Sequence, residues 1–129
     1  MPKHTYTFTK KRHNLTQILT DHDLASLGDA YVNFAYSLAL SDRIGKPSGA
    51  KTKGSMLAEA LRKAGLRKYL PSRMTRHMLA DAAEALIVYA WLDGDITLEE
   101  CVVVLEKDDD ITSGLSQLLN IIKTRIKLF

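Results

Sequence analysis

LASLGDAYVNFAYSLALS, residues 24–41, is the stretch that decides the fold of this chain. Its apolar residues recur three and four positions apart, which is the spacing of one face of an α-helix. We therefore expect a helix from Leu24 to Ser41, capped by Asp21 or Asp23. The side chains expected to face the core are Leu24, Leu27, Tyr31, Phe34 and Leu38. Gly28 stands inside this helix, where a glycine costs about 1 kcal/mol relative to alanine. Close approach of a second helix would explain it.

A second helical stretch, LADAAEALIVYAWL (residues 79–92), carries two carboxylates among small and apolar residues. Asp81 and Glu84 are three positions apart, so their side chains leave the same face about one turn apart. Burying an ionised carboxylate costs several kcal/mol unless a partner compensates for it. If the two long helices cross near Gly28, Asp29 converges with this pair. Three acids suffice for Mg²⁺, which takes one or two carboxylates and keeps several waters.

The rest of the chain also has helical periodicity, broken by capping residues and glycines. Further helices are expected at residues 15–20, at 55–64 with Gly65 in a left-handed conformation, at 73–92 as the longest helix, at 97–107 after a capping box, and at 111–126. Residues 41–54 form a basic, irregular connection between the first long helix and the next. The expected fold class is all-α, with about six to seven helices.

Composition indicates one globular domain. The chain has 129 residues, 46% of them apolar, and no apolar run long enough to span a bilayer. Cys101 is the single cysteine, so no disulfide can form within the chain, and a reducing cytoplasm is the expected location. The net charge of +3 is compatible with a nucleic-acid partner but does not by itself indicate one.

Each acidic pattern also has an ordinary structural explanation. Asp29 belongs to a polar stripe with Ser26, Asn33 and Ser37, which is typical of a solvated helix face. An Asp-x-x-Glu pair commonly forms salt bridges, and Arg73, Arg76 and His77 are near enough in sequence to be its partners. Together, the two patterns say more than either one alone.

The two patterns together resemble the endonuclease domain of ribonuclease III. That family has Leu-Gly-Asp-Ala in one long helix and Asp-x-x-Glu-Ala, followed by a small apolar run, in another. Here the matching residues are Leu27–Ala30 and Asp81–Ala85, and the resemblance covers residues 20–95. The usual domain has a glutamate one turn before the motif aspartate, whereas this chain has Ala25. A branch resembling Mini-ribonuclease III also lacks that glutamate and consists of a catalytic domain alone, which implies a single domain over residues 1–129 without a separate double-stranded-RNA-binding domain.

The resemblance implies a Mg²⁺-dependent endoribonuclease, with Mn²⁺ as a substitute, that cleaves double-stranded or structured RNA as a homodimer. It makes Asp29, Asp81 and Glu84 both the catalytic residues and the metal ligands. The expected RNA contacts are the basic side chains of Lys10, Lys11, Arg12, Lys46, Lys51, Lys53, Arg73 and Arg76. Ala25 leaves a second reading open, in which the chain is a catalytically silent member of the fold that binds RNA or scaffolds a complex. A third reading is a basic helical nucleic-acid-binding module unrelated to the family.

Overall fold

The computed structural model describes residues 6–8 and 14–127, and in this part of the chain the regular elements are helices and no strand occurs. In chain order the elements are α1 (Leu15–Leu19), α2 (His22–Ile44), α3 (Gly54–Lys63), the 3₁₀ turn η1 (Arg67–Tyr69), α4 (Arg76–Asp93), α5 (Leu98–Lys107) and α6 (Ile111–Arg125). The prediction of an all-α fold is confirmed.

The helix ends follow local capping chemistry, but α2 and α4 differ from the expected boundaries. α2 runs from His22 to Ile44, beyond the predicted Leu24–Ser41 and into the connection expected at residues 41–54. Asp21 caps α2 by accepting a hydrogen bond from the Leu24 amide at 3.0 Å, and both halves of the capping box before α5 are formed. The prediction that α4 begins at Arg73 and is the longest helix is wrong, because α4 begins at Arg76 and α2 has 23 residues against its 18. Thr75 is the cap that defines this start, since its hydroxyl accepts from the amide of Met78.

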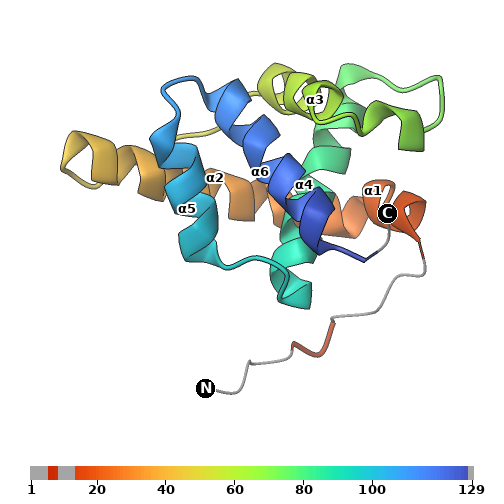
Figure 1. The fold of residues 1–129 in the computed structure, drawn as a ribbon, viewed down its shortest axis with the longest axis horizontal. Helices are drawn as coiled ribbons and strands as arrows, with labels where there is room; N and C mark the ends of the chain where they lie inside the picture. Colours follow the sequence, from red (N-terminus) through yellow and green to blue (C-terminus); the bar gives the residue numbers. More distant parts are fainter. Residues whose placement is uncertain (1–5, 9–13, 128–129) are drawn as a thin grey trace.

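The centre of the fold is α4. Every residue from 79 to 90 is buried except Asp81, which is half-buried. α4 packs against α1, α2, α3 and α6, while α5 packs against α2 and α6 (Figure 1). Among the residues described, no helix has the length together with the hydrophobicity that crossing a membrane would require.

α2 and α4 cross in close contact at Gly28. A Cβ atom added there would lie 2.5 Å from the carbonyl carbon of Glu84 and closer still to its oxygen. Any side chain larger than hydrogen would force the two backbones apart. The expectation that close helix approach explains this glycine is confirmed, and the crossing places Asp29 beside the segment that carries Asp81 and Glu84.

The face of α2 that packs on α4 is rotated from the predicted one. Leu24 and Tyr31 are buried as expected, but Leu27 and Phe34 are 39% and 54% exposed. The buried face instead consists mainly of small residues: Ala25, Gly28, Val32, Ala35 and Ala39. The crossing at Gly28 is too close for large side chains, so α2 turns its small residues inward and leaves two large apolar ones at the surface.

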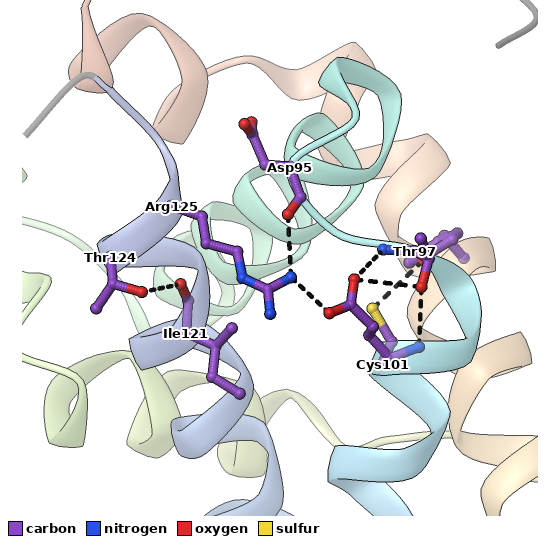
Figure 2. A network of polar contacts seen from close by, with 8 residues as sticks. Asp95, Thr97, Cys101, Ile121, Thr124 and Arg125 are labelled. Carbon is purple, nitrogen blue, oxygen red and sulfur yellow. Dashed lines mark hydrogen bonds and ion pairs between the residues drawn. The ribbon is translucent and has the colours of Figure 1, made fainter. Parts of the chain in front are cut away.

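The C-terminal helix is joined to the connection between α4 and α5 by one arginine (Figure 2). Arg125 donates to the backbone carbonyl of Asp95 at 3.2 Å and forms an ion pair with Glu100 at 2.7 Å. The same Glu100 carboxylate accepts from the Thr97 amide at the start of α5. These contacts hold three consecutive elements together at one end of the molecule.

Candidate active site

A cavity of about 380 Å³ opens beside the crossing of α2 and α4. Asp29 reaches it from α2, and Asp81 and Glu84 reach it from α4, so the structure brings together the three acids singled out from the sequence. The remaining lining residues are His22, Ala25 and Ser26 of α2, Thr52 of the connection, Gly54 and Leu57 of α3, and His77 and Ala80 of α4.

Glu84 is the least solvated of the three acids. Only 5% of the residue is exposed, and its Oε2 atom is buried with no hydrogen-bond partner. Burial raises the pKa of Glu84 to about 8, with further contributions from a hydrogen bond to Asp29 and from the negative charges of Asp29 and Asp81. The folded protein therefore keeps a proton on this carboxyl group at pH values where the unfolded chain has released it.

The other two carboxylates have polar partners within their own helices. Asp81 is half-buried, and one of its oxygens lies 3.5 Å from Nε2 of His77, one turn earlier on α4. Asp29 is exposed, and its Oδ1 accepts a hydrogen bond of 3.3 Å from the side-chain amide of Asn33. Each of the two is thus oriented by a neighbour four positions away, whereas Oε2 of Glu84 is buried without a hydrogen-bond partner.

This donor set fits a divalent cation bound partly through water. A cation would satisfy the orphaned oxygen of Glu84 and offset the repulsion among the three acids. Mg²⁺ binds through one or two carboxylates and several waters, and therefore does not need a complete protein cage. Within the described part of the chain, no three acidic, histidine or cysteine side chains form a ready-made ligand cluster, so the carboxylates would have to close in around the ion.

Ala25, the position that departs from the family pattern, is buried and lines the cavity. Its methyl group leaves space where the usual domain has a carboxylate. Glu59 does not replace that group, because it lies outside the cavity lining and pairs with Arg62 at 3.1 Å. The additional titratable groups of the cavity are instead the two histidines, His22 and His77.

Only the first half of the polar stripe on α2 is exposed to solvent. Ser26 and Asp29 are exposed, whereas Asn33 and Ser37 are half-buried and both bind the connection that leads to α3. This connection supplies Thr52 and, with the start of α3, Gly54 to the cavity wall. The sequence pattern identified neither wall residue. The only signal for them was the recurrence of polar residues along α2, which is equally typical of a helix facing water.

The expected RNA-contacting residues lie in several places. Lys10, Lys11 and Arg12 fall outside the described residues. Lys46, Lys51 and Arg73 are exposed in connections, the last one just before α4. Lys53 and Arg76 line an open cleft of about 560 Å³ at the beginnings of α3 and α4, and this cleft shares Gly54 and His77 with the acidic cavity. Two of the expected basic residues therefore line a cleft that adjoins the acidic cavity.

Comparison with known proteins gives a family match, which covers most of the chain. No curated protein matches the chain in sequence. The model of the family described as ribonuclease III matches residues 22–128, which include both acidic helices, the connection between α2 and α3, and the helices α3, α5 and α6. The chain belongs to the ribonuclease III family.

Proposed function

We propose that this protein is a Mg²⁺-dependent endoribonuclease that hydrolyses phosphodiester bonds in double-stranded or structured RNA. Family membership supports a ribonuclease III-type role in RNA processing. The observation that carries the finer proposal is the convergence of Asp29, Asp81 and Glu84 on one cavity, with a buried oxygen of Glu84 unpartnered. Retaining three mutually repelling acids at a helix crossing is costly unless a cation binds them.

In this proposal the three carboxylates hold Mg²⁺, or Mn²⁺ as its substitute, together with water. The bound ion would polarise the phosphate and lower the pKa of a water molecule that attacks phosphorus. The protein residues contribute orientation: His77 holds Asp81, and Asn33 holds Asp29. Glu84 must release its proton before it can bind a cation. Metal binding should therefore strengthen as the pH rises toward the raised pKa of this group.

The basic residues around the cavity are placed to contact the RNA backbone. The deep, narrow major groove of A-form RNA leaves phosphates and 2′-hydroxyls as the main contacts. Lys53 and Arg76 line the cleft that adjoins the acidic cavity, so a strand with one phosphate at the acids can place a neighbouring phosphate between these cations. Lys46 and Lys51 extend the positive surface along the connection, and such contacts make binding sensitive to salt.

The homodimer is proposed from an apolar strip on α2. Leu27 and Phe34 are exposed, and Ala30 lies exposed between them on the same helix. Exposed large apolar side chains in a row are typical of a protein–protein contact. Leu27 and Ala30 flank the pair Gly28–Asp29, so a second copy bound to this strip would bring two acidic cavities near one RNA duplex, one for each strand.

The proposal is tested by incubating the purified protein with end-labelled duplex RNA over a range of Mg²⁺ and Mn²⁺ concentrations. Cleavage by the wild type, lost in Asp29→Asn and Glu84→Gln, is the expected result. Asp93→Asn is the matched control, because it makes the same change at the exposed end of α4 and should cleave normally. Absence of cleavage by the wild type at every metal concentration would refute the enzymatic role.

A second candidate function is favoured by Ala25, which lines the cavity in place of a carboxylate. In this reading the chain is a ribonuclease III fold that binds RNA or scaffolds a complex without cutting. Wild-type protein that binds duplex RNA in a salt-dependent manner, with no cleavage and no response to Mn²⁺, would support this candidate over the first one.

A further inference from the structure

The connection between α2 and α3 is bound to α2 by side chains that imitate the edge of a β-strand. Ser41 Oγ accepts from the Ser48 amide at 2.8 Å and donates to the Ser48 carbonyl at 3.0 Å. Ser37 Oγ makes the same two bonds with Ala50, at 2.9 and 3.0 Å. Each hydroxyl thus satisfies both backbone groups of one residue, as a neighbouring strand would.

Asn33 makes the third rung. Its Oδ1 accepts from the Thr52 amide at 2.8 Å and from the Thr52 hydroxyl at 3.1 Å. Its Nδ2 donates to Asp29 at 3.3 Å. We call Asn33, Ser37 and Ser41 the polar ladder. Asn33 contacts both the connection and one of the acids.

The ladder is in register because two different repeats have nearly the same length. Four residues of an α-helix rise about 6 Å, and two residues of extended chain span about 6.6 Å. Successive rungs are four apart on α2 and two apart on the connection, and they run in opposite directions. The reversal occurs at Gly45, whose φ of 77° continues the turn after α2.

The same register separates two faces of the connection. Ser48, Ala50 and Thr52 are half-buried, whereas the alternate residues 47, 49, 51 and 53 are exposed. This alternation is that of a strand with one face covered. It places Lys51 and Lys53 on the outward side, away from α2.

Continuing the same spacing by one more rung leads to two residues of the candidate active site. The position four before Asn33 is Asp29, and the position two after Thr52 is Gly54. Both line the acidic cavity, so the cavity begins where the ladder ends. The ladder and the cavity wall that contains Thr52 and Gly54 are therefore continuous along the connection.

We propose that the polar ladder is the device that positions the basic connection at the site, with Asn33 as a positioning residue for Asp29. This inference rests on the proposed function. Asn33 holds the Asp29 carboxylate and the Thr52 end of the wall with one side chain. Ser37 and Ser41 hold the extended segment so that Lys51 and Lys53 face an RNA backbone bound at the acids.

Amide hydrogen exchange on the full chain tests the ladder independently of any activity. In the double variant Ser37→Ala/Ser41→Ala, the amides of residues 48 and 50 lose their acceptors and should exchange about tenfold faster than in the wild type. Thr124→Ala is the matched control, because it removes a hydroxyl that bonds only within α6, and residues 48–52 should exchange unchanged. Unchanged exchange in the double variant would overturn the ladder.

Two further measurements test the positioning role. Asn33→Ala should raise the Mn²⁺ concentration that gives half-maximal thermal stabilisation by about tenfold, because Asp29 loses its oriented partner. The double serine variant should leave that midpoint unchanged, while raising KM for duplex RNA with little change in kcat. An unchanged Mn²⁺ midpoint in Asn33→Ala would overturn the role of Asn33. If the wild type neither responds to Mn²⁺ nor cleaves RNA, the proposed function fails and the positioning role fails with it, while hydrogen exchange still decides whether the ladder exists.

Discussion

Replacing Gly28 by alanine tests the helix crossing on which the candidate site depends. The added Cβ would meet the backbone carbonyl group of Glu84, with the carbonyl carbon at 2.5 Å. A flexible side chain could rotate away, but a backbone carbonyl in the middle of a buried helix cannot. α2 and α4 must therefore separate, and the contacts of the small residues around the crossing loosen together.

The expected loss of stability is the difference between two effects. Overpacking a core costs about 1–3 kcal/mol, and a clash with backbone belongs at the upper end of that range. Against this, replacing glycine by alanine stabilises the helix by about 1 kcal/mol, because alanine has the higher helix propensity. The free energy of unfolding should therefore fall by about 2 kcal/mol, which lowers the melting temperature by about 8 °C for a domain of this size.

Gly114→Ala provides a control with the opposite expected sign. Gly114 lies in α6, and a Cβ there would meet its nearest neighbours at 3.6 Å, which is ordinary van der Waals contact. This variant should gain about 0.5–1 kcal/mol from helix propensity alone. Both variants would be compared with the wild type by urea denaturation. A Gly28→Ala protein as stable as the wild type would refute the close crossing.

Three further predictions concern charge and association. The pKa of Glu84 is raised from 4.5 to about 8, so between these pH values the metal-free folded state binds a proton that the unfolded chain has lost. The melting temperature should therefore fall as the pH rises through this range. Glu84→Gln should flatten this dependence of melting temperature on pH. Arg125→Met should lower the urea concentration at the midpoint of unfolding, because its contacts with Asp95 and Glu100 are lost. In analytical ultracentrifugation the wild type should be a dimer and Phe34→Lys a monomer. A wild type that is already monomeric at micromolar concentration would contradict the proposed homodimer.

The sequence predicted the helices well where local chemistry determines their ends. The capping box at Thr97 and the aspartate before α2 act within one helical turn, so their signals are readable from neighbouring residues. The sequence places the start of α4 three residues too early, because Pro71-Ser72 has the composition of a helix N-terminus. In the structure Arg67 donates to the carbonyls of both of these residues and keeps them outside the helix. That contact comes from a neighbouring turn, and spacing within α4 does not reveal it.

The orientation of α2 was harder to predict, because large and small apolar residues occur on adjacent faces of the same helix. Hydrophobicity alone favours Leu27 and Phe34 as core residues. The short distance between the α2 and α4 backbones instead favours the face with Gly28 and the alanines. Because the backbone of Glu84 lies so close to Gly28, this steric requirement outweighs the hydrophobicity of the larger side chains. A glycine flanked by alanines at helical spacing was the available signal, and it carried more information about packing than the leucine stripe.

The two motifs allowed the convergence of the three acids to be predicted from the sequence, but they did not predict the cavity around the acids. Asp29, Asp81 and Glu84 each lie on a helix whose crossing the glycine marks, so their meeting depends on two elements only. The wall that contains Thr52 depends on a connection with no periodicity of its own, and its placement is determined by side chains of α2. Polar residues in a helix can face water or bind a loop, and the sequence of the helix alone does not distinguish these two environments.

The site combines two features, each of which by itself lowers the stability of the fold. A glycine inside α2 lowers helix stability, and Glu84 is buried with an unsatisfied oxygen beside Asp29 and Asp81. The first arrangement is what permits the second, because only a close crossing brings the acids within reach of one another. A bound cation would offset the electrostatic cost but would leave the steric constraint at Gly28 unchanged. Metal should therefore stabilise the wild type more at pH 8 than at pH 5, and it should not rescue the packing defect of Gly28→Ala.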